Sequence, residues 1–201
     1  MITVYGRRNS SNCAKVFWLL DALDQPFTLE PAGRGAEARD PEAAGRLSPT
    51  GTVPVVRVGE AIVWESNAIL RCLATSAPAS PLWPVDTALR GAIDSWMDWA
   101  SLSLTPPLGR LRKARAAGQV ADAEATVQAF SLLDRHLAGR DHLVGDTLTL
   151  ADIAIAPAVF RWRLWEGSAR DILPDQPNLL AYHENLRTHA GYRRHVEGAL
   201  T

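Results

Sequence analysis

The sequence predicts an α/β domain with the element order βαβαββα, followed by an all-helical domain. Two observations support this division. Short β-rich runs alternate with amphipathic helical segments over residues 1–76, whereas every signal from residue 87 onward is helical. The segment at 77–86 is rich in proline, which continues neither a helix nor the interior of a sheet, so we expect a linker there.

The first two elements are a strand at residues 2–5 and a helix at residues 11–23. Apolar residues recur along the helical segment with the 3.6-residue spacing of one buried face. Ser10, Ser11 or Asn12 can cap its start, because each carries a short polar side chain that can accept from the first backbone N–H groups.

The remaining elements of the α/β domain continue the alternation. We expect a second strand at 26–30 and a short helix at 41–47. "VPVVRV" and "AIVWE" read as two strands around a turn at 59–60, which predicts a hairpin. A helix from 65 to 75 completes the domain.

One segment of the helical domain carries a clear start signal. In "DTLTLADIAIAPAV" (146–159), Thr149 is a cap residue and Asp152 stands three residues later, as in a capping box. The apolar residues that follow predict the buried central helix of this domain, bent at Pro157. The Pro106-Pro107 pair is expected to end or kink a long helix nearby.

The bulk composition excludes several classes of protein. The formal net charge is −1, so no basic field indicates a nucleic-acid or membrane partner. Only two cysteines occur, Cys13 and Cys72, which fits a reducing compartment. No signal peptide or membrane-spanning run is apparent, so we expect a cytoplasmic protein. The five histidines show no metal-ligand spacing, and no metal is expected.

The first candidate site is the start of the first helix, where S-x-x-C stands in place of the C-x-x-C of many redox proteins. Ser10 occupies the position of the first thiol, and Cys13 falls one turn inside the helix on its apolar face. A serine cannot exchange disulfides, but its hydroxyl and the helix N-terminus can stabilise a thiolate that a ligand brings. The same residues also make an ordinary helix cap, which the local sequence alone favours.

The second candidate site is Thr52-Val53-Pro54, where a strand begins. Proline is tolerated at the first residue of a strand. A cis bond before Pro54 would turn the Val53 backbone outward, free to pair with an extended, peptide-like ligand. An ordinary trans bond is the alternative, which the local sequence favours.

The third candidate site is Glu65-Ser66, at a strand-to-helix junction. Ser66 can offer its hydroxyl and its backbone N–H to a carboxylate, and Glu65 can neutralise an ammonium group. A plain helix cap is the alternative. A thiolate stabiliser, an edge for peptide backbone and a clamp for an α-amino carboxylate are together the parts that glutathione requires.

These motifs resemble the cytosolic glutathione transferases, and the resemblance covers nearly all of the chain. "SSNCAKVFWLLDALDQPF", the "VP" before the third strand and "ESNAI" fit that family in order and spacing. "LTLADIAIAP" and "PNLLAYHENLRTHAGYRRHV" are similar to its buried capped helix and its usual C-terminal end. The sequence of the first of these segments is most similar to bacterial members of the family with theta, phi and nu features. The resemblance implies a thioredoxin-like first domain, at 1–76, and the glutathione transferase fold.

The resemblance also implies the site residues. Ser10 would contact the glutathione sulfur, with Asn12 as the alternative and Ser11 between them. The residues assigned to glutathione binding are Ser10, Thr52, Val53, cis-Pro54, Glu65 and Ser66. Many relatives carry Gln, Lys or Arg at the position of Thr52, and Arg39 is a basic residue that would compensate. Candidates for an electrophile pocket in the helical domain, 87–201, are Trp99, Leu104, Leu108, Arg112, Phe160 and Trp165.

The implied activity is transfer of the glutathione thiolate to a hydrophobic electrophile, with glutathione as co-substrate and a homodimer as the assembly. Two alternatives remain open. One is glutathione-dependent reduction of peroxides or disulfides, which an Asn12-type site would favour. The other is a protein without catalytic activity that binds glutathione or another ligand.

Overall fold

The computed structural model describes residues 1–33, 43–77, 80–166 and 175–200. These residues form two compact units. The first unit comprises Met1–Val85 together with the residues from His189 onward, and the second comprises Asp86–Thr188. The sequence placed 87–201 in one helical domain, whereas in the structure the residues after Thr188 pack within the first unit.

The described residues of the first unit contain one mixed sheet. Its strands are β1 (Ile2–Gly6), β2 (Phe27–Pro31), β3 (Val55–Val58) and β4 (Ala61–Trp64), in the order β2-β1-β3-β4. β1 is parallel to β2 because a helical crossover joins them, whereas β3 and β4 are antiparallel because a tight turn joins them. β1 also pairs with β3 in the antiparallel sense. The predicted strands are confirmed.

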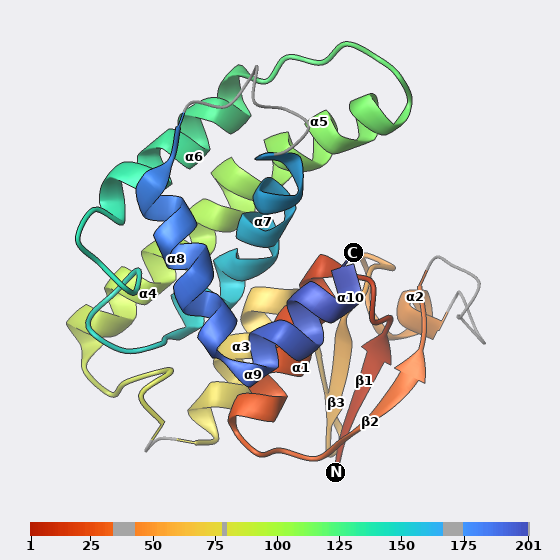
Figure 1. The fold of residues 1–201 in the computed structure, drawn as a ribbon. Helices are drawn as coiled ribbons and strands as arrows, with labels where there is room; N and C mark the ends of the chain where they lie inside the picture. The colour runs from red at the N-terminus through yellow and green to blue at the C-terminus, as the bar shows by residue number, and fades with distance from the viewer. Residues whose placement is uncertain (34–42, 78–79, 167–174, 201) are drawn as a thin grey trace. The chain divides into compact units, whose positions relative to one another are not determined.

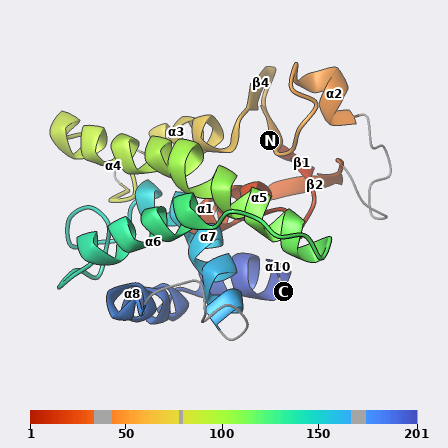
Figure 2. The same ribbon diagram turned by 90° about the horizontal axis from the view of Figure 1, so that it is seen from above.

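The helices between these strands are α1 (Ser11–Ala22), α2 (Ala43–Leu47) and α3 (Ser66–Thr75). α1 packs on α3, and in both views the strands separate α2 from α3 (Figures 1 and 2). Cys13 is buried on α1, as the sequence predicted, and Cys72 is exposed on α3. The predicted order βαβαββα is therefore the order of the structure.

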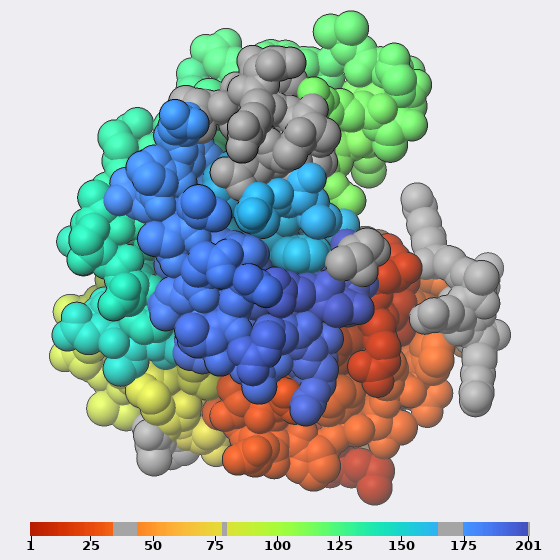
Figure 3. Space-filling model, in the orientation of Figure 1, coloured from red at the N-terminus to blue at the C-terminus, as the bar shows by residue number. Residues whose placement is uncertain are grey.

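α1 is buried on every side. Each residue from Cys13 to Leu20 is buried, whereas the spacing of apolar residues predicted one buried face. The difference arises from a C-terminal segment that comprises α9 (Ala190–Tyr192), the π-helical turn η2 (Arg193–Glu197) and α10 (Gly198–Leu200). The Trp18 ring lies 5.7 Å from that of Tyr192, and the Phe17 ring lies 6.0 Å from that of His195. Figure 3 shows the dark-blue C-terminal residues beside the red N-terminal ones.

The described elements of the second unit are α4 (Thr87–Trp99), η1 (Ala100–Leu104), α5 (Thr105–Ala116), α6 (Glu124–His136), α7 (Leu150–Glu166) and α8 (Pro177–Thr188). η1 is a π-helical turn that carries the chain from α4 into α5. The Pro106-Pro107 pair lies in the first turn of α5. η1 interrupts the α-helical hydrogen bonding directly before this pair, so the two prolines mark the break between α4 and α5, where the sequence predicted that they would end or kink a long helix.

α7 begins as the sequence predicted, at a cap organised by Asp152. The backbone N–H and the hydroxyl of Thr149 donate to Asp152 Oδ2 at 2.8 and 3.0 Å. Oδ1 accepts the backbone N–H of Leu143 at 2.9 Å and the hydroxyl of Tyr182, on α8, at 2.7 Å. Asp152 is 0% exposed, so these hydrogen bonds replace its lost hydration and join three segments of the second unit. Pro157 stands inside α7 without ending it.

Gly191 of α9 is required by the close approach of Trp18. A Cβ at Gly191 would collide with the indole ring of Trp18, so Gly191→Ala should destabilise the protein by about 1–3 kcal/mol. Gly91→Ala, in α4, is the matched control. A Cβ there meets nothing within 4 Å, and alanine favours a helix by up to about 1 kcal/mol. Urea denaturation followed by circular dichroism measures both, and equal effects would contradict the packing of α9 on α1.

Asp152→Ala should destabilise the second unit strongly, because it leaves buried donors without an acceptor. Each unsatisfied donor costs about 1–3 kcal/mol, so we expect a total loss of roughly 3 kcal/mol or more. Tyr182→Phe removes a single donor and should cost about 1 kcal/mol. Asp146→Ala, at an exposed carboxylate nearby, is the control and should stay within about 0.5 kcal/mol of wild type. Thermal denaturation of the full chain separates these three outcomes.

Candidate functional site

Ser10 lies between β1 and α1 and is the N-cap of α1. Its backbone is extended, with φ −99° and ψ 123°, and its Oγ accepts the backbone N–H of Cys13 at 3.4 Å. Ser10 is 8% exposed. A hydroxyl that accepts one hydrogen bond retains its own proton to donate, so capping α1 and contacting a ligand sulfur are compatible roles for Ser10.

Cys13 is a core residue rather than a reactive thiol. Burial raises the pKa of the Cys13 thiol, and hydrogen bonds from Ser10 and from the Arg7 backbone oppose this rise, as does the charge of Arg7. The raised pKa keeps Cys13 as the neutral thiol near pH 7. The Ser10 hydroxyl of the free protein therefore has a neutral sulfur beside it, and a thiolate carried by a ligand would be the stronger acceptor.

The three candidates for a thiol contact differ in their exposure. Ser10 is almost buried, Ser11 is half-buried and Asn12 is exposed in the first turn of α1. Asn12 is thus the most accessible side chain, whereas Ser10 is the one that the fold holds in a fixed position. Both remain candidates.

The Val53–Pro54 peptide bond is cis, as the family resemblance implied. The bond precedes β3, which begins at Val55. In the described part of the chain, Val53 takes no part in the backbone pairing of the sheet. Its side chain packs against Gly33, where a Cβ would come within 3.0 Å of Val53 and where φ is +90°. The described sheet pairing therefore does not include the Val53 backbone, and its pairing with a ligand stays a prediction.

Thr52 is exposed and belongs to a short chain of hydroxyl groups. Ser48 Oγ lies 2.9 Å from Thr50 Oγ1, which lies 2.9 Å from Thr52 Oγ1. Ser48 is buried, so the chain anchors Thr52 to the core through two hydroxyls. Sequence reasoning identified Thr52 but missed Ser48 and Thr50. Arg39, proposed as a substitute for the longer side chains of relatives, lies outside the described residues.

Glu65 and Ser66 form the junction between β4 and α3. Glu65 has φ +67° and ψ 119°, a conformation that a side chain disfavours by about 1–3 kcal/mol. It is the N-cap residue of α3, but its side chain makes no capping hydrogen bond. Ser66 is the first residue of α3 and is buried. The plain cap suggested as an alternative is therefore not what the Glu65 side chain provides.

Lys15 is a buried polar residue beside Ser66 that sequence reasoning missed. It lies on α1, is 4% exposed, and its Nζ donates to Ser66 Oγ at 3.5 Å. Burial lowers the pKa of Lys15 from 10.5 to about 8, and the charge of Glu65 partly opposes that shift. The signal available in the sequence was a lysine within a run of residues that are otherwise all apolar, from Cys13 to Leu20.

The electrophile candidates fall into two groups within the second unit. Leu104, Leu108 and Arg112 are spaced at four-residue intervals along η1 and α5, and Phe160 is buried on α7. Trp99 instead lines a hollow of about 380 Å³ with Pro107, Arg110 and residues of α6. Trp165 lies in α7, but its side chain is not among those that the structure describes.

Two half-buried arginines lie close together beside the first of these groups. Burial, and to a lesser extent the charge of Arg112, lower the pKa of Arg161 to about 10. Burial also lowers the pKa of Arg112. Arg112 and Arg161 are therefore close enough for the charge of one to affect the other, which the sequence did not indicate.

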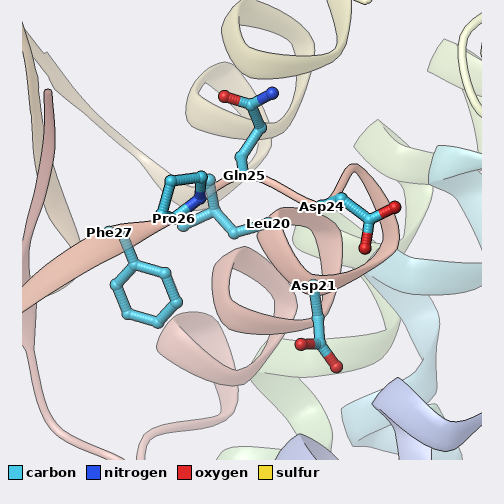
Figure 4. Close-up of a pocket in the computed structure, with 6 residues that line it drawn as sticks. All are labelled: Leu20, Asp21, Asp24, Gln25, Pro26 and Phe27. Atoms are coloured by element: carbon cyan, nitrogen blue, oxygen red, sulfur yellow. The ribbon is translucent and has the colours of Figure 1, made fainter.

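A second hollow, of about 600 Å³, lies at the C-terminal end of α1, away from Ser10. Figure 4 shows its lining by Leu20, Asp21, Asp24, Gln25, Pro26 and Phe27. Asp21 is paired with Arg194 at 2.9 Å and faces His195 at 3.4 Å, so this carboxylate serves the attachment of the C-terminal segment. None of the residues that line this hollow is a candidate site residue.

No group of three or more His, Cys, Asp and Glu side chains among the described residues is placed to hold a metal ion. No described helix is both long enough and apolar enough to cross a membrane.

Lys15→Met should stabilise the protein near neutral pH. Between pH 8 and pH 10.5 the folded state binds fewer protons than the unfolded state, because burial lowers the Lys15 pKa from 10.5 to about 8. The penalty of burying the charge is thus complete below pH 8 and disappears as the pH rises toward 10.5. The shift corresponds to about 3 kcal/mol. Urea denaturation at pH 7 and pH 10 should show the advantage of Lys15→Met shrinking.

Lys113→Met is the matched control for that experiment, because Lys113 is the other lysine of the chain and is exposed on α5. It should change the stability by less than about 0.5 kcal/mol at either pH. A pH-independent gain from Lys15→Met would contradict a buried ammonium at this position.

Comparison with known protein families matches both parts of the chain. A family model for the glutathione S-transferase N-terminal domain matches residues 9–76, and one for the C-terminal domain matches residues 117–185. The chain is 35% identical over 171 residues to glutathione S-transferase GstB of Escherichia coli, covering 80% of this chain and 82% of that protein. It is also 30% identical over 167 residues to elongation factor 1-gamma of Prunus avium, covering 79% of this chain and 39% of that protein.

Comparison with solved structures confirms the expected fold. A theta-class glutathione S-transferase from Xanthomonas axonopodis pv. citri, solved with glutathione bound, superposes with a TM-score of 0.83. It is 33% identical, and the match covers 100% of this chain and 99% of that one. A delta-class glutathione transferase from Nilaparvata lugens superposes with a TM-score of 0.87 at 22% identity, covering 100% and 95%, and so supports the fold alone.

Proposed function

The chain belongs to the glutathione S-transferase family, and we propose that it transfers the thiolate of glutathione to hydrophobic electrophiles. The observation that carries this proposal is the position of Ser10. Its hydroxyl is fixed at the N-terminus of α1 and keeps a proton to donate, beside a sulfur that stays neutral. A thiolate placed there would receive a charge-assisted hydrogen bond and the favourable end of the helix dipole.

The energy required for this role is modest. A free thiol has a pKa near 8.5, so only a few per cent is ionised at neutral pH. Lowering that pKa by roughly two units requires about 2.7 kcal/mol of preferential stabilisation of the thiolate. A hydrogen bond to a charged acceptor contributes about 1.5–3 kcal/mol, and a helix terminus adds about 0.3–1 kcal/mol. Ser10 and α1 together are therefore sufficient.

The other contacts follow the chemistry of the tripeptide. Val53 would pair with the cysteinyl backbone of glutathione, since it stands outside the pairing of the sheet. Glu65 and Ser66 would hold the ammonium and carboxylate of the γ-glutamyl end. The similar Xanthomonas enzyme was solved with glutathione bound, which supports glutathione as the ligand.

The electrophile would contact residues of the second unit, namely Leu104, Leu108, Arg112 and Phe160, with Trp99 and Trp165 as further candidates. Leu104, Leu108 and Phe160 provide apolar surface. The Arg112 guanidinium would stabilise negative charge that develops on an electrophile when a thiolate adds to it.

A second activity is favoured by the exposure of Asn12. If Asn12 rather than Ser10 contacts the sulfur, we expect glutathione-dependent reduction of peroxides or disulfides. A protein that binds glutathione without turnover is a third candidate, and the similarity to elongation factor 1-gamma supports it. Like its family, the protein would form a homodimer, which sedimentation of the purified chain measures.

The proposed function predicts that the protein is retained on immobilised glutathione and conjugates a chloronitrobenzene. Ser10→Ala should raise the pKa of the bound glutathione thiol by roughly one to two units and lower the rate at neutral pH about tenfold or more. The ultraviolet absorbance of the thiolate gives this pKa. The pH dependence of kcat/KM for the chloronitrobenzene, measured with saturating glutathione, gives an independent value.

Ser10→Gly separates catalysis from capping. Glycine at an N-cap costs only a few tenths of a kcal/mol, whereas alanine costs about 1 kcal/mol. Both variants should therefore raise the thiol pKa equally, although they differ in stability. A silent Ser10→Ala with a crippled Asn12→Ala would transfer the role to Asn12. Absence of any glutathione binding would contradict both enzymatic functions, and binding without turnover would favour the ligand-binding protein.

A further inference from the structure

Lys15 is a buried charge that the packing of α1 does not explain. Every other residue from Cys13 to Leu20 is apolar and buried, so a methionine of similar length would suit the same position. The Lys15 ammonium group loses its hydration there. The hydrogen bond to Ser66, 51 residues away in the sequence, and the charge of Glu65 compensate part of that loss. The tip of the side chain, rather than its stem, is what distinguishes Lys15 from an apolar residue.

The direction of the Lys15–Ser66 hydrogen bond fixes how Ser66 can act. An ammonium group only donates, so Ser66 Oγ must be the acceptor. A hydroxyl that accepts from one side has its own proton left for another acceptor. Ser66 is the first residue of α3, so its backbone N–H is among those without a helical partner. Lys15 therefore leaves Ser66 with two donors, the hydroxyl and the N–H, for a carboxylate.

The positive charge of Lys15 also strengthens Ser66 as a donor. A donated hydrogen bond from an ammonium polarises the hydroxyl that accepts it, which strengthens the bond that this hydroxyl donates in turn. Glu65 is the neighbouring carboxylate, and its charge favours the protonated form of Lys15. The 3.5 Å separation of Nζ and Oγ is at the long end for a hydrogen bond, and such contacts tighten when a ligand completes a site.

We propose that Lys15 is a positioning residue of the γ-glutamyl subsite: its ammonium group holds the Ser66 hydroxyl so that it donates to the α-carboxylate of the ligand. This inference rests on the proposed function, because it requires glutathione as the ligand. Lys15 acts through Ser66 and lies below the surface that the ligand meets. It should therefore control the affinity for the γ-glutamyl end and leave the chemistry at the sulfur unchanged.

The test compares two probes and three variants. S-methylglutathione carries the γ-glutamyl group, and S-methylcysteinylglycine lacks it; neither has a free thiol, so thiol ionisation does not contribute. Lys15→Arg keeps charge and donors, Lys15→Gln keeps a donor without charge, and Lys15→Met keeps neither. Calorimetric titration of the full-length protein with each probe measures the affinities, and circular dichroism checks that each variant is folded.

We expect the affinity for S-methylglutathione to fall in the order wild type, Lys15→Arg, Lys15→Gln, Lys15→Met, with a loss of about tenfold for the last. Binding of S-methylcysteinylglycine should stay within about twofold for all three variants. In the conjugation assay, KM for glutathione should rise about tenfold in Lys15→Met while kcat stays within about threefold. Ser66→Ala should make the Lys15→Met substitution nearly silent, because the hydroxyl through which Lys15 acts is gone.

The opposing outcomes are distinct. Equal affinities for S-methylglutathione across the folded variants overturn the role of Lys15 alone. An equal loss for both probes also overturns it, because that pattern indicates a general structural defect. If Lys15→Met does not fold, the comparison of Lys15→Arg with Lys15→Gln decides. Wild-type protein that binds no S-methylglutathione overturns the proposed function, and this inference with it.

Discussion

The burial of α1 from Cys13 to Leu20 is the constraint on which the first unit depends. Phe27 of β2, α3 and the C-terminal segment all pack on this one helix, so each side chain from Cys13 to Leu20 must be apolar or find its polar partner inside. Lys15 meets that condition through Ser66, across 51 residues of sequence. The helix that presents Ser10 is thereby joined to the residues expected to hold the far end of a ligand.

Much of the fold could be predicted because its signals are local. The order of strands and helices in the first domain and the Thr149–Asp152 cap are visible within windows of a few residues, and both are confirmed. The packing of the C-terminal segment within the first unit was not predictable in the same way. Periodicity indicates that residues around Tyr192 are helical, but the core that they fill depends on Gly191 admitting Trp18 of a distant helix. Contacts of that range leave no pattern in a single sequence.

The candidate site divides along the same line. Ser10, Val53-Pro54 and Ser66 stand at boundaries of elements, where residue type and spacing carry information. Lys15 stands inside a helix, where a lysine is ordinarily expected on the solvent side, but it is 4% exposed and its Nζ meets Ser66 on α3. The positive φ of Glu65 had no sequence signal either, because glycine or asparagine, not glutamate, is the usual residue in that region.

Two unfavourable features meet at the β4–α3 junction. Glu65 is held in a disfavoured backbone conformation without serving as a side-chain cap, and Lys15 is an ammonium group removed from water. Neither feature favours folding on its own. An ammonium group beside Glu65 and a carboxylate at Ser66 would complete the charges that the fold leaves here. Binding would then stabilise the folded state by linkage, and the two charges of this junction would favour a ligand that carries an ammonium and a carboxylate at one end.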